Sequence, residues 1–426
     1  MPGGANNVGA GLGDMANITN AAARRPELHE IAPREVNGRD VIARFEGQFR
    51  SAALACLKIL EGKGTDRVFC DYHDDFVERE LVNGEKTYHF VQVKTKKKKS
   101  YQWSRNDLLG IPKNLPKVAA NVHGPGGVAA PSQDESKKLS GSFIGKLLIH
   151  TAHFKDACAS VTFQTNVHFD GDVEKIELAL MSAQFDERTL RYLADNYSGI
   201  CGPTDATLMP EIENRLAKLR FSGGNDFLHP HDHDFETKAK AALYQFCEID
   251  VSHAEGLELA VKLLGLVQKR SSAETLHTMS VAELELTVSV GLDELLDLLP
   301  ISPGAYRTFL ANGDSSALKN ASILQRKLGP LDASGVLVEI ASKWKVDWET
   351  WSRTARHTYE VDWVLLQAKL NKIYGHWAGG ELAFFDIHKE ATKLLASLDH
   401  TPLKGLLTVN LLLGAIMSEL VRSEAR

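Results

Sequence analysis

Apolar residues recur every three or four positions between residues 41 and 60, a spacing that predicts an amphipathic helix. The apolar positions are Val41, Phe45, Phe49, Ala52, Ala53, Cys56, Leu57 and Leu60. Gly62 and Gly64 follow directly, and glycine is the residue that most often ends a helix. We therefore expect the first regular element to be a helix that ends just before Gly62.

Two segments of strand-like character follow this helix and predict a β-hairpin. They are residues 67–81 (RVFCDYHDDFVEREL) and residues 86–96 (KTYHFVQVKTK). The dipeptide Asn83-Gly84 between them favours a two-residue turn with positive φ at both positions. Such a turn pairs Val82 with Glu85, and counting outward then places Asp75 opposite Gln92.

The pattern after the hairpin predicts a helix at 143–155 and a strand at 159–169, and from about residue 175 onward helices dominate. Residues 121–142 and 222–234 are rich in glycine, proline and polar residues and predict loops. We divide the chain into a flexible extension (1–37), a domain at 38–225 and a helical assembly or regulatory domain at 226–426. The expected fold class is α/β, with a mixed central sheet flanked by helices, followed by an all-α C-terminal region.

Composition limits the classes of function. The 426 residues carry a net charge of -6, so any contact with nucleic acid must come from local basic patches. The five cysteines are odd in number and form no CxxC pair, which favours a reducing cytoplasm. The most apolar segment, residues 406–421, is shorter than the ~20 residues of a membrane span. We expect a cytoplasmic protein without membrane contact, in which this segment is a buried or partner-facing helix.

The candidate chemistry lies on the hairpin. Gln92 and Lys94 are two residues apart on one strand, so both point to the same face, and Asp75 on the partner strand joins them. A register shift of one residue would exchange Asp74 for Asp75. His73 has the parity of Asp75, and it is either near the substrate or a solvated strand histidine.

These residue types suit hydrolysis of a phosphodiester. Carboxylate and amide oxygens bind Mg²⁺, for which Mn²⁺ can substitute, and the ion polarises the phosphate and acidifies bound water. A neighbouring lysine stabilises the developing negative charge. On the preceding helix Glu46 or Gln48 can add a ligand, but a two-residue offset prevents both from facing inward. The proposed metal ligands are thus Asp75 and Gln92, with Asp74 and Glu46 as further candidates.

Two other clusters are open to more than one interpretation. The lysines that follow the second strand either bind DNA phosphates or form a solvated loop; they are Lys96, Lys97, Lys98 and Lys99. Tyr101 and Trp103 either stack on a base or pack in the core, and we favour the core. A third cluster, His229, His231 and His233, has alternate spacing but no second group of ligands, which favours a solvated or partner-facing loop over a metal site.

Several short segments together resemble a known family. They are RFEGQ (44–48), DYHDDFVE (71–78) and FVQVKTK (90–96), with weaker similarity in WSRNDLL (103–109), GSFIGKLL (141–148) and FQTNVHF (163–169). The segments resemble the nuclease domain of a bacterial antiphage double-stranded DNA endonuclease family. That domain is similar to Mrr-type restriction endonucleases of the PD-(D/E)xK class. It occurs fused to a SAVED sensor in CBASS effectors and in proteins encoded beside HerA-type ATPases.

The resemblance implies a restriction-endonuclease-like fold and catalytic roles for Asp75, Gln92, Lys94 and the helix residue Gln48. The expected function is metal-dependent cleavage of double-stranded DNA in antiphage defence, by a homo-oligomer that has a HerA-type ATPase as partner. Gln92 departs from the broader pattern, in which an acid is commoner. Three competing functions stay open: a catalytically inactive nuclease fold that binds DNA or protein, a nuclease for RNA or single strands, and a cyclic-nucleotide-activated effector.

Overall fold

The computed structural model describes residues 37–110, 133–202, 208–229, 234–247, 253–275, 279–299, 301–332, 334–398 and 402–424. The chain divides into two compact units, residues 1–42 and 43–426. In the first unit the described part is residues 37–42, the beginning of α1 (Asn37–Leu57). The expected flexible extension therefore lies almost entirely outside the described residues. The second unit contains the sheet and all the other described helices.

The central sheet of the described residues has six strands in the order β7-β5-β3-β2-β1-β8. Their bounds are β1 Thr65–Tyr72, β2 Asp74–Val82, β3 Glu85–Lys94, β5 Cys158–Thr165, β7 Leu219–Ser222 and β8 Ser289–Gly291. Strands β8, β1, β2 and β3 pair antiparallel, whereas β3, β5 and β7 pair parallel. Two short strands, β4 (Gln102–Trp103) and β6 (His168–Phe169), pair separately. The sheet is mixed, as the sequence predicted.

The predicted hairpin is present with the predicted register. Asn83 and Gly84 have φ values of 54° and 86°, as a two-residue turn between twisted strands requires. Val82 pairs with Glu85, and the ladder continues to the pair of Phe76 and Val91. The turn chemistry written in the sequence therefore determines which residues of β2 and β3 lie side by side.

The prediction of a single strand over residues 67–81 is wrong. The segment forms two antiparallel strands, β1 and β2, in which Tyr72 pairs with Asp74 across His73. His73 has a φ of 67°, in the left-handed region that reverses the chain within one residue. Residues 71–75 (DYHDD) contain no glycine, proline or asparagine that would mark a tight turn, so the pattern does not reveal it.

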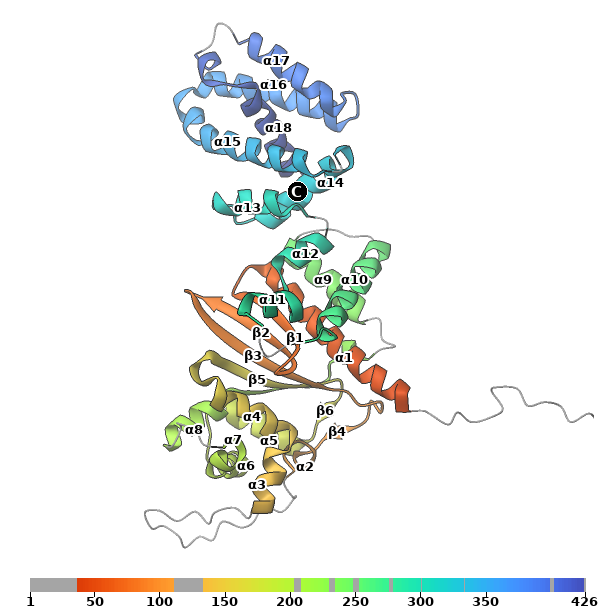
Figure 1. Cartoon of the computed structure of the whole chain (residues 1–426). Coiled ribbons are helices and arrows are strands. Elements are labelled where there is room, and N and C mark those ends of the chain that lie inside the picture. The colour runs from red at the N-terminus through yellow and green to blue at the C-terminus, as the bar shows by residue number, and fades with distance from the viewer. Residues whose placement is uncertain are drawn as a thin grey trace, which may run out of the picture. The chain divides into compact units, whose positions relative to one another are not determined.

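Helices cover both faces of the sheet (Figure 1). On one face, Val91 and Val93 of β3 belong to a core that also contains α1 and helices from the later part of the chain. On the other face a second core contains Phe90 of β3 and Phe163 of β5 together with α4. The helices between β4 and β7 are α2 Arg105–Leu109, α3 Gln133–Ser140, α4 Phe143–His153, α5 Gly171–Met181, α6 Arg188–Asp195, α7 Tyr197–Cys201 and α8 Met209–Leu216.

After β7, the regular elements that the structure describes are helices apart from β8, which the sequence pattern did not predict. Its helices are α9 Asp234–Cys247, α10 His253–Ser271, α11 Val281–Val288, α12 Leu292–Leu298, α13 Pro303–Ala311, α14 Ala317–Leu328, α15 Val336–Thr358, α16 Glu360–Ala378, α17 Phe384–Ala396 and α18 Val409–Glu424. The expected fold class is confirmed: a mixed sheet flanked by helices precedes an all-helical region. Because β8 pairs with β1, one segment of the expected helical domain completes the sheet.

The apolar segment at residues 406–421 forms most of α18, whose inward side is buried. Gly414 lies against the main-chain carbonyl of Trp344 on α15, where a Cβ atom would have no room. Within the described ranges, no helix combines the length and the apolar character that crossing a bilayer demands. This segment is therefore a core helix.

Candidate active site

Tight chain reversal at His73 brings two carboxylates to the end of strand β3. Asp74 and Asp75 are the first residues of β2, and β3 ends at Lys94. The regular ladder between the two strands stops at Phe76 and Val91. Beyond that pair, the side chains of Asp74 and Asp75 accept hydrogen bonds from residues of β3.

Asp75 contacts the final residues of β3. Its Oδ2 atom accepts a hydrogen bond of 2.9 Å from Nζ of Lys94 and one of 2.6 Å from the main-chain N–H of Val93. The side chains of Asp75 and Lys94 are 13% and 26% exposed, so this ion pair is partly shielded from water. The adjacency of Asp75 and Lys94 is the arrangement that the hairpin register predicted.

Asp74, rather than Asp75, makes the contact with Gln92. Asp74 Oδ1 accepts hydrogen bonds from Nε2 of Gln92 at 3.4 Å and from the main-chain N–H of Asp75 at 3.0 Å. Asp74 Oδ2 lies 3.2 Å from Nε2 of His150 on α4. Among the described residues, no hydrogen bond joins Asp75 to Gln92, and the regular ladder ends one pair earlier, at Phe76 and Val91.

Burial determines the electrostatics of the acids. It raises the pKa of Asp75 above its ordinary value, although Lys94 and the N–H of Val93 act in the opposite direction. The pKa of Asp71, at the end of β1, is also raised, by burial and then by the nearby charge of Asp74. Three carboxylates therefore lie near one ammonium group, an arrangement that favours the arrival of a further cation.

The donor set fits a divalent ion that keeps much of its hydration. Gln92 is 8% exposed, and its Oε1 atom is buried without a hydrogen-bond partner among the described residues. Magnesium binds through one or two protein carboxylates and retains several waters. Within the described ranges, no three His, Cys, Asp or Glu residues form a metal-binding group. The fit therefore depends on Asp75, the amide oxygen of Gln92 and oxygens from water or substrate.

The helix candidates have different surroundings. Glu46 forms an ion pair of 3.0 Å with Arg50, one turn along α1. Gln48 is half-buried and, in the part of the chain that the structure describes, makes no hydrogen bond to the acids, Gln92 or Lys94. Between them Gly47 faces Thr95, and a Cβ atom at position 47 would lie 2.8 Å from Thr95 Cγ2. This glycine allows α1 to approach the end of β3.

The lysine run divides into two environments. Lys96 Nζ lies 4.3 Å and 4.2 Å from the ring centroids of Tyr101 and Trp103, so its charge is held over aromatic faces. Trp103 is buried, and its Nε1–H donates to Thr165 Oγ1 at 2.9 Å. Core packing of Trp103 is thus confirmed. The side chains that remain on the surface are those of Lys97, Lys98 and Lys99.

The predicted histidine cluster is only partly within the described residues. His229 Nε2 lies 2.8 Å from Asn166 Nδ2, and its carbonyl accepts a 2.6 Å hydrogen bond from Arg50. His231 and His233 lie outside the described residues. His73 has an exposed side chain at the β1–β2 turn, and its ring contacts Phe154 edge-on at 5.2 Å.

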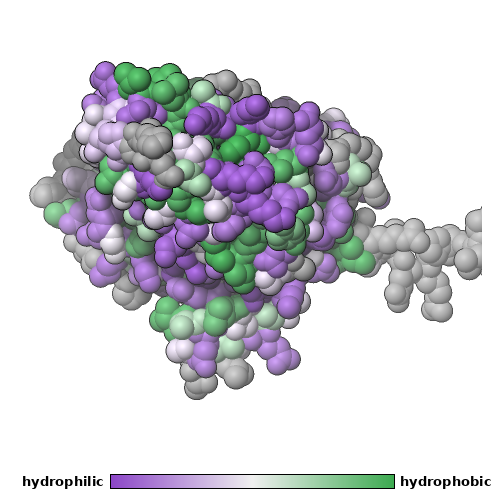
Figure 2. Space-filling view, turned by 90° about the horizontal axis from the view of Figure 1, so that it is seen from above, coloured by the Kyte–Doolittle hydropathy of each residue, from purple (hydrophilic) through white to green (hydrophobic). Residues whose placement is uncertain are grey.

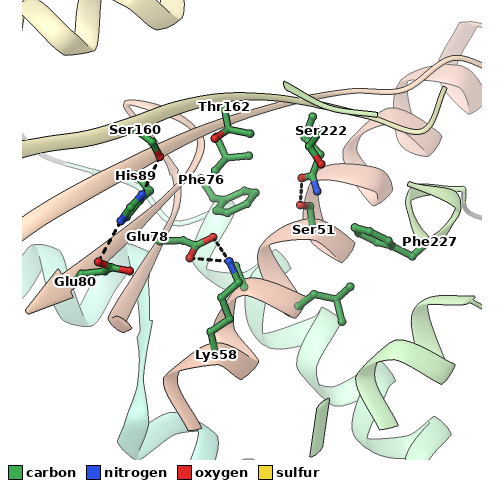
Figure 3. A pocket seen from close by; sticks show the side chains of 14 residues that line it. Ser51, Lys58, Phe76, Glu78, Glu80, His89, Ser160, Thr162, Ser222 and Phe227 are labelled. Atoms are coloured by element: carbon green, nitrogen blue, oxygen red, sulfur yellow. Dashed lines mark hydrogen bonds and ion pairs between the residues drawn. The ribbon is translucent and has the colours of Figure 1, made fainter. Parts of the chain in front are cut away.

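A separate pocket of about 420 Å³ opens on the α1 face of the sheet (Figure 3). Its polar groups are paired with one another: Lys58 with Glu78 at 2.9 Å, and His89 with Ser160 at 2.8 Å. None of Asp74, Asp75, Gln92 or Lys94 lines this pocket. We therefore place the candidate chemistry at the end of β3 and not in this cavity.

Sequence reasoning missed His150 and the packing role of Gly47. His150 is distant from the hairpin in sequence, and only the packing of α4 on the sheet brings it to Asp74. The sequence offered one indication of His150: in the segment GSFIGKLLIH (141–150), a histidine follows an apolar stretch of helical character. Gly47 was visible as the central small residue of RFEGQ, but the pattern named no partner for it.

Comparison with known proteins adds the final observation. Residues 37–202, which include the whole candidate site, match the family model described as Cap4, dsDNA endonuclease domain. No curated protein and no solved structure matches the chain. The match spans less than half of the chain and leaves most of the helical region outside it. The first part of this chain is thus similar to the dsDNA endonuclease domain of Cap4, which confirms the resemblance to an antiphage-defence dsDNA nuclease family.

Proposed function

We propose that the chain is a Mg²⁺-dependent endonuclease that cleaves double-stranded DNA in the bacterial cytoplasm as part of antiphage defence. The observation that carries this proposal is the contact of 2.9 Å between Asp75 and Lys94. It occurs within the segment that matches a dsDNA endonuclease domain, beside the unpartnered oxygen of Gln92.

Each residue has a distinct proposed role. Asp75 and Gln92 hold the ion, which when bound polarises the scissile phosphate and acidifies a water molecule. The ammonium of Lys94 stabilises negative charge on the phosphate and orients the attacking water. Gln48 assists from α1, whereas Glu46 is less available for a metal because it pairs with Arg50.

The first test compares two lysines of the same strand. Lys94→Ala should abolish degradation of a plasmid in Mg²⁺, because the group that stabilises charge is removed. Lys86→Ala, at the exposed beginning of β3, should cleave like the wild type. Circular dichroism and melting curves verify that both variants are folded. Undiminished cleavage by Lys94→Ala would defeat the catalytic assignment.

A binding subunit without catalytic activity is the second candidate function, and the neutral side chain of Gln92 favours it. Such a protein would retain duplex DNA in a gel-shift assay but leave it intact at every concentration of Mg²⁺ or Mn²⁺. Parallel assays with RNA and single-stranded DNA identify a nuclease for those substrates, and added cyclic oligonucleotides identify a ligand-activated effector. Cleavage of duplex DNA without a cyclic oligonucleotide would exclude both the binding subunit and obligatory activation by such a ligand.

We also propose that the chain forms a homo-oligomer through the exposed side of α16. Val361, Val364 and Leu365 are 75%, 65% and 58% exposed and share one side of this helix. Glu360 is exposed next to that side at the N-terminal end of α16, and Lys372 is exposed on it towards the other end. Two copies packed antiparallel would bury the apolar residues and place each Glu360 near the partner's Lys372. Figure 2 looks down on the end where Figure 1 draws α16 and α17 and shows hydrophobic residues among hydrophilic ones.

Light scattering tests this interface. Leu365→Glu should reduce the native mass, whereas Val261→Glu, at an exposed apolar position of α10, should leave it unchanged. Glu360→Lys should weaken the assembly, and the double variant with Lys372→Glu should restore it. An unchanged mass for Leu365→Glu would exclude this surface as the interface.

A HerA-type ATPase is the proposed heterologous partner. The proposal rests on the resemblance to nucleases that are encoded beside such ATPases, and an ATPase ring would provide the control that a DNA-cleaving enzyme needs inside its host. Mixing the two proteins should give one species of larger mass by light scattering. Two separate species under all tested salt concentrations would contradict the partnership.

A further inference from the structure

The two ends of the Gln92 amide have different surroundings. Its Nε2 atom donates to Asp74 Oδ1 at 3.4 Å, whereas Oε1 is buried without a hydrogen-bond partner among the described residues. A buried acceptor without a partner is costly in a folded protein. The unpartnered oxygen therefore indicates that a ligand atom completes this position.

Orientation matters for an amide in a way that it does not for a carboxylate. A carboxylate offers an oxygen at either end, whereas an amide rotated by half a turn presents NH₂, which cannot bind a cation. A carboxylate oxygen accepts hydrogen bonds, and Asp74 Oδ1 accepts from the NH₂ end of Gln92. The oxygen of Gln92 is then directed away from Asp74.

Asp74 is itself held in place. Its side chain is 6% exposed, and Oδ2 lies 3.2 Å from His150 Nε2. The His150 ring stacks on Phe90 with centroids 4.3 Å apart and an interplanar angle of 8°. The main-chain N–H of Asp75 donates to the other oxygen of Asp74 at 3.0 Å. Contacts on both oxygens therefore restrict rotation of the Asp74 carboxylate.

We infer that Asp74 and His150 are positioning residues, which orient the amide of Gln92 so that Oε1 faces a divalent cation. This inference rests on the proposed metal-dependent function. It explains how a neutral glutamine serves at a position where an acid is commoner. It also changes the role of Asp74 from a candidate metal ligand to the group that orients one.

A rescue experiment in the full chain tests the inference by Mn²⁺ binding, measured by electron paramagnetic resonance in the absence of DNA. Asp74→Asn replaces an acceptor with an amide that can pair with either end of Gln92, so Mn²⁺ affinity should fall by about tenfold or more. Adding Gln92→Glu should restore the affinity, because a carboxylate needs no such orientation. Rescue of this kind would not follow from a merely structural role.

The second pair of variants acts through α4. His150→Phe keeps a ring against Phe90 but removes the contact with Asp74, so it should also weaken Mn²⁺ binding, with rescue by Gln92→Glu. His153→Phe, at an exposed position of the same helix, is the matched control and should bind as the wild type does. If Asp74→Asn does not fold, this pair provides the same test.

The outcomes separate the inference from the function on which it rests. Wild-type affinity in Asp74→Asn would overturn the positioning role, whatever the cleavage assays show. Loss of affinity without rescue by Gln92→Glu would also overturn it, because Asp74 would then be a metal ligand. Wild-type protein that neither binds Mn²⁺ nor cleaves DNA would instead refute the proposed metal-dependent function.

Discussion

The carboxylate of Asp75 and the ammonium of Lys94 lie 2.9 Å apart at the end of β3, although they are 19 positions apart in the chain. Asp75 is largely buried, and burial raises its pKa more than Lys94 lowers it. Ionisation of Asp75 therefore lowers the stability of the folded protein. Such a cost is common at sites that are organised for binding or catalysis.

The first prediction concerns pH and uses Asp75→Asn, which removes the titrating group. Because the folded-state pKa of Asp75 is raised, the protonated carboxyl stabilises the folded state. This stabilisation is complete below the ordinary pKa of aspartate and is lost as pH rises through the raised pKa. With EDTA present, the wild type should therefore lose a few degrees in Tm relative to the variant between acidic and neutral pH. Melting curves across that range measure the difference, and a difference that does not change with pH would contradict burial as the dominant cause.

The second prediction concerns the approach of α1 to β3. Gly47→Ala places a methyl group 2.8 Å from Thr95 Cγ2 and 3.1 Å from the carbonyl oxygen of Leu228, so it should lower the free energy of unfolding by about 1–3 kcal/mol. Gly265→Ala is the control, because nothing lies within 4 Å of a Cβ at that helical position. It should be neutral or stabilise by up to about 1 kcal/mol. Urea unfolding measures the free energy of unfolding of both variants. If Gly47→Ala were as stable as Gly265→Ala, α1 would have moved to accommodate the methyl group without an energetic cost.

The third prediction separates the exposed lysines from Lys96. Replacing Lys97, Lys98 and Lys99 together with glutamine should reduce the slope of log K against log salt for duplex binding by about 2–3, if each contacts one phosphate. Lys96→Gln should change that slope little, because the Lys96 charge lies over Tyr101 and Trp103.

Fluorescence anisotropy at several salt concentrations measures these slopes. The control replaces Lys389 and Lys393 of α17 with glutamine. These two lysines pair with Asp386 and Glu390, so the control should not change the slope. A slope that the triple variant does not alter would assign the lysine run to a solvated loop.

The fourth prediction concerns the one-residue turn at His73, whose φ of 67° disfavours a side chain with a Cβ. His73→Gly and His73→Ala both lose the imidazole ring, but only alanine keeps the strain. The glycine variant should therefore be more stable by about 1 kcal/mol. At Lys86, within β3, the order should reverse, since glycine weakens an extended strand by roughly 0.5–1 kcal/mol. Thermal unfolding gives both comparisons, and the same order at the two sites would show that His73 is not strained.

Local features of the sequence determined much of the candidate site. The turn at Asn83-Gly84 sets the register of β2 and β3, and the period of two along β3 places Gln92 on the face opposite Val91 and Val93. Both features depend only on neighbouring residues, because turn conformation and strand pleating are local properties of the backbone. The hairpin and the proximity of Asp75 to Lys94 therefore follow from the order of residues alone.

Tertiary packing decided the rest. The contact of Asp74 with Gln92 forms beyond the regular ladder of β2 and β3, where the turn at Asn83-Gly84 no longer determines which side chains meet. His150 reaches Asp74 only because α4 packs against the sheet, and β8 joins β1 from more than 200 residues further along the chain. Such contacts depend on how segments distant in sequence fill a shared core. No periodicity or spacing along the chain encodes which distant segments those will be.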